Sequence, residues 1–500
     1  MPVDVHEIGR VLREQNPWKE TGHVPEALAQ KVERPLVAGL TATLLRDNPR
    51  RYQLVLGPRR VGKTTVMYQT VRRLLAAGVP RQQLAWLRLD HPYLLPIDLG
   101  TLVRVLIELG DSASGQPIYL FLDELVYAEN WDTWLKTFYD EQWPVKIVST
   151  SSATAALHRR QVESGVGRWE EQFLAPYHLT EFLKLTGTEL ALEADDNLFS
   201  TLIRNLGRYT ANNGQIAQAR RRLALIGGFP ELLTQLERSR NEEEQVLASQ
   251  IVLRKDAIDR AVYKDIPQSF GVDSPMMLER LLYVLAGQLT GLLSPNTITG
   301  ELGISQPTFD RYLSYLERAF LVFTLPNYSG RELTVQKRGR KLYFVDGAIR
   351  NAALQRGTRC LDDPVEAGYL LENFVASHLR GLAEQENVRL FHWRQGQYEV
   401  DLIYDHPVAP LAIEVAVSNS HSKRGLIEFA RAHPRFTNRC WMASEDAVGI
   451  PPESGSDGVG TIPVDLLLLA IGAQTSRALS QRLGAAPEPP PEAQLLFAVS

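Results

Sequence analysis

Short apolar runs alternate with amphipathic stretches between residues 51 and 185, and this alternation predicts a parallel α/β sheet. Each run is followed by a segment in which apolar residues recur every three or four positions, the spacing of a helix with one buried face. The predicted strands are Tyr52–Leu56, Leu84–Leu89, Ile118–Leu122 and Val145–Ser149, and the predicted helices are Lys63–Ala77, Leu99–Leu109 and Trp131–Glu141.

The hydrophobic pattern changes several times along the rest of the chain, which predicts an α/β protein of several domains. Helical patterns dominate after the predicted sheet, and a helix, a tight turn, a second helix and two strands then suggest a winged helix-turn-helix. The predicted division is an N-terminal helical segment at 1–50, the α/β core at 51–185, a helical lid or linker at 186–290, the winged helix-turn-helix at 291–350, a smaller α/β domain at 351–445 and a C-terminal extension at 446–500.

Composition narrows the class of protein without identifying it. The 500 residues carry 54 Lys and Arg against 58 Asp and Glu, a net charge of -4, so nucleic-acid binding requires a local basic patch. The only cysteines, Cys360 and Cys440, support neither a disulfide framework nor a zinc site. No signal sequence follows Met1, and the apolar runs are too short to span a membrane, so we expect a cytoplasmic protein without a membrane partner.

A glycine-rich loop stands directly between the first predicted strand and the helix that follows it. Its form is G-x-x-x-x-G-K-T, in which backbone N–H groups surround a phosphate and Lys63 reaches the terminal phosphate oxygens. Thr64 offers a hydroxyl to Mg²⁺, and the positive end of the helix dipole favours the same anion. The expected cofactors are ATP and Mg²⁺, and the predicted nucleotide-binding residues are Gly57, Pro58, Arg59, Arg60, Val61, Gly62, Lys63, Thr64 and Thr65.

The next two predicted strands end in polar residues that suit phosphate hydrolysis. Asp123 and Glu124 fit a Walker B element, in which Asp123 holds Mg²⁺ and Glu124 activates water as the general base. The alternative, a surface acidic pair, is disfavoured by the preceding loop. The later strand ends in Ser149–Ser152, where Ser151 is the candidate sensor of the γ-phosphate, although such a cluster is equally an ordinary helix N-cap.

Several short motifs together resemble a family of prokaryotic AAA+-type P-loop ATPases that carry a C-terminal domain of unknown function. They are Gly57–Thr65, Leu89-Asp90, Phe121–Glu124, Ser151–Ala153, Gly167-Arg168, Leu179–Phe182 and, less specifically, Gly227–Glu231. The resemblance implies a homo-oligomer, a hexamer being one form, in which an arginine from one subunit completes the ATP site of its neighbour. Arg168 is the candidate for that catalytic role, with Arg159 and Arg160 as substitutes and a plain surface arginine as the alternative.

Departures from the family pattern limit what is carried over. Residues 149–152 read Ser-Thr-Ser-Ser where the family has Thr-Gly-Ser-Ser, so the sensor is less securely assigned than Lys63 or Asp123. Gly227–Glu231 is also explained by a plain glycine break between helices.

The predicted winged helix carries a concentration of positive charge in an otherwise acidic chain. A basic loop between its two strands, beside a polar helix, suits contacts with DNA phosphates and weak sequence reading. A purely structural winged helix with a solvated loop is the alternative. The candidate DNA-binding residues are Gln306, Thr308, Arg311, Arg331, Lys337, Arg338, Arg340 and Lys341.

In the smaller α/β domain, the segments Glu399–Ile403 and Leu411–Ala416 follow a predicted helix that carries Glu372, and this pattern resembles the core of the PD-(D/E)xK nuclease fold. Asp401 and Glu414 lie on adjacent predicted strands, and Glu372 lies on the preceding helix. Two such carboxylates can share Mg²⁺ while a lysine supports the attacking water, but Ala416 stands where that lysine belongs. Lys423 is a remote substitute. We therefore expect a degenerate site with lost or feeble cleavage.

The function expected from these patterns is ATP hydrolysis coupled to remodelling of double-stranded or branched DNA, by a helicase, branch-migration or translocase type of motor. One alternative is an ATP-dependent switch that controls a partner protein or a defence response. A metal-dependent nuclease is the third.

Overall fold

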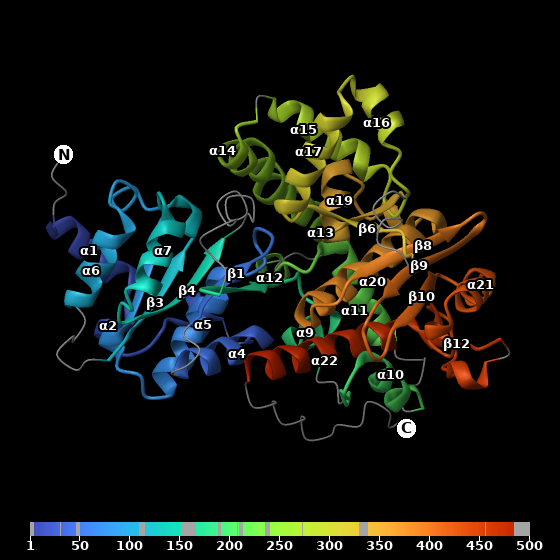
Figure 1. The fold of residues 1–500 in the computed structure, drawn as a ribbon, viewed down its shortest axis with the longest axis horizontal. Helices are drawn as coiled ribbons and strands as arrows, with labels where there is room; N and C mark the ends of the chain where they lie inside the picture. The colour runs from blue at the N-terminus through green and yellow to red at the C-terminus, as the bar shows by residue number, and fades with distance from the viewer. Residues whose placement is uncertain are drawn as a thin grey trace. The chain divides into compact units, whose positions relative to one another are not determined.

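The computed structural model describes residues 5–30, 32–46, 51–109, 116–151, 167–188, 192–207, 209, 214–235, 241–272, 274–329, 339–455 and 457–484. The chain divides into two compact units (Figure 1). The first unit comprises Met1–Leu174 with Leu479–Pro487, and the second comprises Ala175–Ala478 with Glu488–Ser500. The finer division into six segments stays a prediction.

The first unit is built on a parallel five-stranded sheet in the order β2-β3-β4-β1-β5. Four of its strands were predicted from their apolar runs. The fifth was not, because the sequence Trp-Glu-Glu-Gln-Phe has acidic residues at its centre. The strands are β1 (Tyr52–Leu56), β2 (Leu84–Arg88), β3 (Ile118–Asp123), β4 (Val145–Ser151) and β5 (Trp169–Phe173).

Helices cover this sheet and share its apolar core. In the core, Val55 and Phe121 of the strands meet Val66 and Val71 of the helix that follows the glycine-rich loop. The helices of the first unit are α1 (Val5–Gln15), α2 (Trp18–Thr21), α3 (Glu26–Ala29), α4 (Pro35–Leu45), α5 (Lys63–Ala76), α6 (Leu99–Leu109) and α7 (Trp131–Asp140), with 3-10 turns at Arg81–Gln83 and Leu125–Tyr127.

The N-terminal segment supplies hydrogen-bond partners to the edge strand β2. The Asn16 side chain accepts from the Trp86 N–H at 2.6 Å and donates to the Trp86 carbonyl at 3.0 Å. The Gln15 side chain accepts from the Arg88 N–H at 2.9 Å. Trp18 is fully buried, and its indole N–H donates to the Leu84 carbonyl at 3.3 Å. The side chains of this segment therefore complete the sheet along that edge.

The second unit contains a five-stranded sheet in the order β12-β11-β10-β9-β8. Strand β9 runs antiparallel to both of its neighbours, β8 and β10, whereas β10, β11 and β12 run parallel to one another. Helices α20 and α21 pack against this sheet. The elements are α20 (Pro364–Glu386), β8 (Leu390–Gln395), β9 (Tyr398–Tyr404), β10 (Leu411–Ala416), α21 (Arg424–Ala432), β11 (Cys440–Ser444) and β12 (Val459–Pro463), with 3-10 turns at Arg359–Leu361, Pro434–Phe436 and Pro452–Ser454.

A helical region and a two-stranded sheet complete the second unit. The two helices and two strands expected between residues 291 and 350 are present, as α16, α17, β6 and β7. The remaining elements of the unit are α9 (Leu179–Leu185), α10 (Leu198–Leu206), α11 (Gly214–Ile226), α12 (Pro230–Gln235), α13 (Glu242–Leu253), π-helical turns at Arg254–Asp259 and Ala261–Asp265, α14 (Ile266–Phe270), α15 (Pro275–Ala286), α16 (Pro295–Leu302), α17 (Gln306–Arg318), β6 (Val322–Pro326), β7 (Arg340–Phe344) and α19 (Gly347–Leu354).

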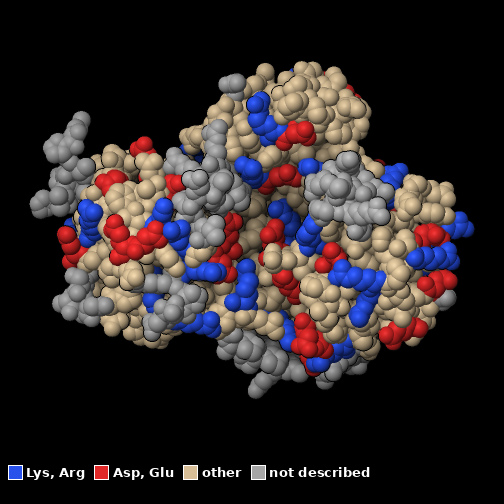
Figure 2. Space-filling view, in the orientation of Figure 1, with Lys and Arg blue, Asp and Glu red and all other residues tan. Residues whose placement is uncertain are grey.

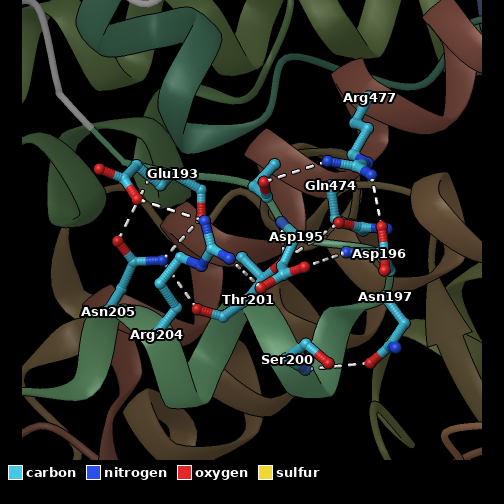
Figure 3. Close-up of polar contacts among 11 residues, drawn as sticks. Glu193, Asp195, Asp196, Asn197, Ser200, Thr201, Arg204, Asn205, Gln474 and Arg477 are labelled. Atoms are coloured by element: carbon cyan, nitrogen blue, oxygen red, sulfur yellow. Dashed lines mark hydrogen bonds and ion pairs between the residues drawn. The ribbon is translucent and has the colours of Figure 1, made fainter.

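Residues 459–483, within the C-terminal extension expected at 446–500, form a strand and a helix. Strand β12 extends the second sheet, and helix α22 (Val464–Leu483) has a buried apolar stretch. A polar network holds α22 to α10 and the segment before it (Figure 3). Thr201 donates to the Gln474 side chain at 3.1 Å, and Arg477 pairs with Asp196 at 2.7 Å. The last turn of α22 belongs to the first unit, where Leu479 and Leu483 join the core.

The Gly-Gly-Phe-Pro segment before α12 forms a crowded backbone junction inside the second unit. Gly228 accepts a 2.8 Å hydrogen bond from the Tyr177 N–H and donates one of 2.7 Å to the Asp346 carboxylate. A Cβ atom on Gly228 would lie 2.5 Å from the Tyr177 nitrogen, closer than real Cβ contacts allow. Only glycine therefore fits at this position.

Candidate functional site

The glycine-rich loop joins β1 to α5 as expected, and its lysine side chain is folded into the loop. Gly62 has φ 93° and caps the start of α5, a backbone conformation that favours glycine. Lys63 is 7% exposed, and its Nζ donates to the carbonyls of Gly57 at 2.9 Å and Pro58 at 2.8 Å. The ammonium group is thus held at the start of α5, where the helix end favours an anion.

Two oxygen donors from different elements meet beside this lysine. Thr64 in the first turn of α5 donates from Oγ1 to both carboxylate oxygens of Asp123, at 3.2 and 3.1 Å. Asp123 is the last residue of β3 and is 6% exposed. A hydroxyl and a carboxylate are the ligands that a hard cation such as Mg²⁺ takes. The donor set therefore fits the expected cofactor.

Thr150 of β4 contacts the acidic pair. Its hydroxyl donates to Asp123 Oδ1 at 2.6 Å and accepts from the backbone N–H of Glu124 at 3.0 Å. Ser149 and Ser151 flank it and are also buried, but successive side chains of a strand point to opposite faces. Ser151 was the candidate γ-phosphate sensor expected from the sequence. Because side chains alternate between the two faces of β4, Thr150 points to one face, and Ser149 and Ser151 point to the other. This alternation was the sequence signal that separates Thr150 from the two serines.

Burial affects the pKa of Asp123, the candidate Walker B aspartate. The pKa of Asp123 is raised to about 6, mainly by burial and also by the neighbouring charge of Glu124, while the hydrogen bonds from Thr150 and Thr64 and the charge of Lys63 lower it. Glu124 follows with φ 55°, the left-handed conformation that non-glycine residues rarely adopt. Such backbone strain is common at functional sites.

Arg34 of the N-terminal segment, which was not among the predicted site residues, donates a hydrogen bond to the glycine-rich loop. Arg34 is 6% exposed and donates from Nη1 to the Val61 carbonyl at 3.0 Å. Gln69 of α5 donates to the Val32 carbonyl at 2.8 Å. Nothing in the local pattern before residue 50 indicates these contacts, because they join segments distant in sequence.

The candidate trans arginine lies at the opposite end of the sheet from the P-loop of its own subunit. Arg168 precedes β5, whose first residue is in register with Tyr52 at the start of β1, whereas the P-loop follows the end of β1. Its guanidinium donates to the two carboxylate oxygens of Asp140 at 2.8 and 3.0 Å. Within one subunit Arg168 is therefore remote from Lys63. The substitutes Arg159 and Arg160 lie outside the described residues.

An arginine that was not predicted lies on the catalytic side of the sheet. Arg88 ends β2 in register with Asp123, and it forms an ion pair with Asp90 at 2.9 Å. It thus shares the carboxyl edge of the sheet with Asp123.

The candidate DNA-binding residues are only partly on the surface. Arg311 and Arg340 are exposed, Gln306 and Thr308 are half-buried, and Gln306 donates to Asp310 at 3.3 Å. Arg331, Lys337 and Arg338 lie outside the described residues. On the face drawn in Figure 2, acidic and basic side chains are interspersed.

The placement of Lys341 on an exposed basic loop is wrong. Lys341 is the second residue of β7 and is 3% exposed. Its Nζ lies 2.8 Å from Glu372 and 2.7 Å from Asp401, two of the three residues expected to form the degenerate nuclease site. Lys341 was assigned to the loop because it directly follows the basic residues of that loop in sequence, although it belongs to the short strand β7.

The three carboxylates of that degenerate site do come together. Glu372 lies on α20, Asp401 on β9 and Glu414 on β10, and Glu414 Oε2 accepts from the Asp401 N–H at 3.3 Å. Among the described residues, no group of three or more His, Cys, Asp or Glu side chains has an arrangement that would hold a metal ion. The same part of the chain contains no helix with the length and hydropathy of a membrane span.

Comparison with known families agrees with this geometry. Residues 49–183 match a family model described as an AAA domain. Residues 217–359 and 367–450 match two domains of unknown function, DUF8612 and DUF4143. The first unit therefore contains an AAA-type P-loop ATPase domain, as the glycine-rich loop predicted. The chain joins that ATPase domain to a C-terminal DUF4143 domain.

Curated proteins that match this chain are prokaryotic and uncharacterized. One from Methanocaldococcus jannaschii is 23% identical over 71% of this chain and 72% of its own length, and another is 25% identical over 76% and 78%. A solved Saccharomyces cerevisiae Hsp104 bound to casein is 16% identical, over 61% of this chain and 52% of that chain, with a TM-score of 0.29. A likeness this weak carries no argument about activity or assembly.

Proposed function

We propose that this protein is a homo-oligomeric ATPase that uses ATP hydrolysis to remodel DNA or a DNA-bound complex. The observation that supports hydrolysis is the Thr150–Asp123–Thr64 cluster beside Lys63, in which the two threonine hydroxyls lie 2.6 to 3.2 Å from one buried carboxylate. A loop that merely stored a nucleotide would need no such polar group at the end of β4.

The residues of the first unit divide the chemical work. Lys63 leaves the loop carbonyls to bind the terminal phosphates, while the backbone of Gly57–Thr65 encloses them. Thr64 and Asp123 would hold Mg²⁺, which supplies charge neutralisation for the transferred phosphoryl group. Glu124 takes a proton from the attacking water as general base. Thr150, in the role first assigned to Ser151, orients Asp123 and the backbone of Glu124.

A short covalent connection supports coupling between ATP turnover and the second unit. The first P-loop residue, Gly57, is so close to Leu174 that a Cβ would lie 2.4 Å from the Leu174 carbonyl oxygen. Three residues later, Tyr177 is hydrogen-bonded to Gly228 within the second unit. We propose that movement of the P-loop is passed along residues 174–177 to the Gly228 junction.

DNA is the proposed partner, bound mainly through phosphates. Of the candidates that the structure describes, Arg311 and Arg340 are the exposed positive charges, and Gln306 and Thr308 are polar neighbours on α17. With two exposed cations among the described candidates, weak affinity with little sequence preference is expected.

The experiment that tests this proposal is steady-state ATP hydrolysis by the full chain with double-stranded or four-way-junction DNA. Stimulation should fall steeply between about 50 mM and about 200 mM salt, since bound phosphates release counterions. An Arg311→Glu/Arg340→Glu variant should lose the stimulation and keep basal hydrolysis, whereas Arg10→Glu on α1 should keep both. A rate indifferent to DNA at every salt concentration would refute the DNA part of the proposal.

One observation favours a second candidate function, a nucleotide-dependent switch. Both carboxylate oxygens of Asp140 bind Arg168 within one subunit, so a monomer satisfies this arginine without a neighbour. Mass measurement with a non-hydrolysable ATP analogue, with and without DNA, separates the two functions. A ring supports the motor, and a monomer with slow turnover supports the switch.

A further inference from the structure

A buried lysine stands at the centre of the acidic cluster in the second unit. Lys341 Nζ lies 2.7 Å from Asp401 Oδ1, 2.8 Å from Glu372 Oε1 and 2.9 Å from Glu399 Oε1. Lysine is almost never buried to this extent unless its charge is paired. Here the three carboxylates surround the ammonium group at hydrogen-bond distance, so its three N–H donors are matched by three acceptors.

The lysine and the carboxylates come from different substructures. Lys341 belongs to β7, which pairs antiparallel with β6 in the two-stranded sheet, where Leu325 is its partner in register. Asp401 and Glu399 lie on β9 of the five-stranded sheet, and Glu372 lies on α20. The positive charge of Lys341 therefore comes from the two-stranded sheet and not from the five-stranded sheet that carries Asp401 and Glu399. The nuclease-like motif has Ala416 at its lysine position, so that motif supplies no cation of its own.

Other donors fix the carboxylates around this ammonium. The Tyr343 hydroxyl, also on β7, donates to Glu372 Oε1 at 2.7 Å. The Val415 N–H donates to Asp401 Oδ2 at 3.0 Å. His421 Nε2 lies 3.4 Å from Glu414 Oε1 at the solvent side of the cluster. The acids are thus held in place by the backbone and by β7, and none of these contacts replaces the central cation.

The charge balance explains why the centre must be positive. Glu372, Glu399, Asp401 and Glu414 bring four carboxylates to a largely buried place, against one lysine and a partly exposed histidine. Burial raises the pKa of Glu372 and of Glu414, because the charged form loses solvation there. Removing the lysine would leave an uncompensated buried charge.

We propose that the Lys341 ammonium is the resident cation of this carboxylate cluster and fills the position that a divalent metal ion would need. The acidic residues therefore do not fit the Mg²⁺ that the nuclease-like fold implies, because the ammonium already occupies their shared centre. The cluster instead fastens strand β7 to α20 and β9. This role is independent of ATP hydrolysis and of DNA binding by the second unit.

The proposal is tested with Mn²⁺ as a paramagnetic divalent probe, measured by electron paramagnetic resonance on the full chain without nucleotide. Wild type and Asp401→Asn should bind the same amount of Mn²⁺, since the ammonium excludes the ion. Lys341→Met should bind an additional equivalent, which Lys341→Met/Asp401→Asn should lose. Mn²⁺ at the P-loop site is common to all four proteins and cancels in the comparison. Wild-type binding that Asp401→Asn removes, or no gain in Lys341→Met, overturns the proposal.

A stability measurement covers the case in which Lys341→Met folds poorly. Mn²⁺ should raise the unfolding temperature of Lys341→Met by more than that of wild type, of the double variant and of the exposed-lysine control Lys255→Met, which share only the P-loop site. A Lys341→Met protein with the same unfolding temperature in Mn²⁺ and in a chelator contradicts the proposal. Plasmid cleavage by wild type in Mg²⁺ or Mn²⁺ that Asp401→Asn abolishes contradicts it as well.

Discussion

Thr150 and Asp123 are joined by a 2.6 Å hydrogen bond between neighbouring strands at the carboxyl edge of the ATPase sheet. The same hydroxyl accepts the N–H of Glu124, so one side chain holds both acidic residues. One threonine of β4 therefore helps to position both the proposed Mg²⁺ ligand and the backbone of the proposed general base.

Replacing Thr150 should damage catalysis more than replacing either adjacent serine. Loss of a group that orients a metal ligand typically lowers activity about 10- to 100-fold. We expect Thr150→Ala to lower kcat by that factor, with Thr150→Ser close to wild type because it keeps the hydroxyl. Ser151→Ala is the matched control on the opposite face of β4. Equal losses of kcat in Thr150→Ala and Ser151→Ala would contradict this prediction, because both residues would then contribute equally to catalysis.

The Mg²⁺ requirement should rise in acid. The pKa of Asp123 is raised to about 6 by burial, and a protonated carboxyl group does not hold a cation. Below pH 6 the ionised fraction falls about tenfold per pH unit, so the Mg²⁺ concentration for half-maximal ATPase should rise as the pH falls. Titrations of Mg²⁺ between pH 5 and pH 8 measure this.

Thr150→Ala supplies the control for this pH dependence. The hydrogen bond from Thr150 lowers the pKa of Asp123, so its removal should move the acid limb toward higher pH. Protonation of ATP itself affects wild type and variant equally and cancels. An acid limb at the same pH in both proteins would assign the titration to another group.

Arg168 and Asp140 form a matched pair for testing action between subunits. If Arg168 completes a neighbouring ATP site, Arg168→Ala should lower the ATPase rate on the order of 10³-fold, and Asp140→Ala should not lower it. The measurement is the rate at increasing protein concentration, since the effect requires assembly. If both substitutions have small and equal effects, the role of Arg168 is limited to its ion pair with Asp140 in the same chain, and the switch is favoured over the motor.

Gly228→Ala should destabilise the second unit. The added methyl group would meet the Tyr177 backbone nitrogen at 2.5 Å, so the junction must open or lose its hydrogen bonds. Forced overpacking costs about 1–3 kcal/mol, and we expect a fall in the unfolding temperature on the order of 5 °C, measured by calorimetry. Gly207→Ala is the control, because nothing lies within 4 Å of the corresponding Cβ position.

The sequence was most informative where a property is local. The first four strands of the ATPase sheet and the P-loop were predictable because each is an apolar run or a motif of adjacent residues. Strand β5 was not predicted because the two glutamates at its centre interrupt the apolar pattern of a buried strand. The structure nevertheless buries the polar residue Gln172 of this strand completely. The burial of Lys341 was not predictable, because the carboxylates that pair with it lie 31 to 60 residues further along the chain. The large separation in sequence between Lys341 and these carboxylates is the reason that their pairing was not predicted.

The contacts of Asn16 with Trp86 have a practical consequence for how this ATPase domain can be handled in isolation. An uncovered outer strand offers its N–H and C=O groups to any other chain in extended conformation, and such strands recruit one another into aggregates. A protein shortened to begin near Tyr52 would lose Asn16, Gln15 and Trp18 together and would present β2 in that state. Solubility would then fail before activity could be judged, so the first residues of the chain belong in any fragment intended for biochemical work.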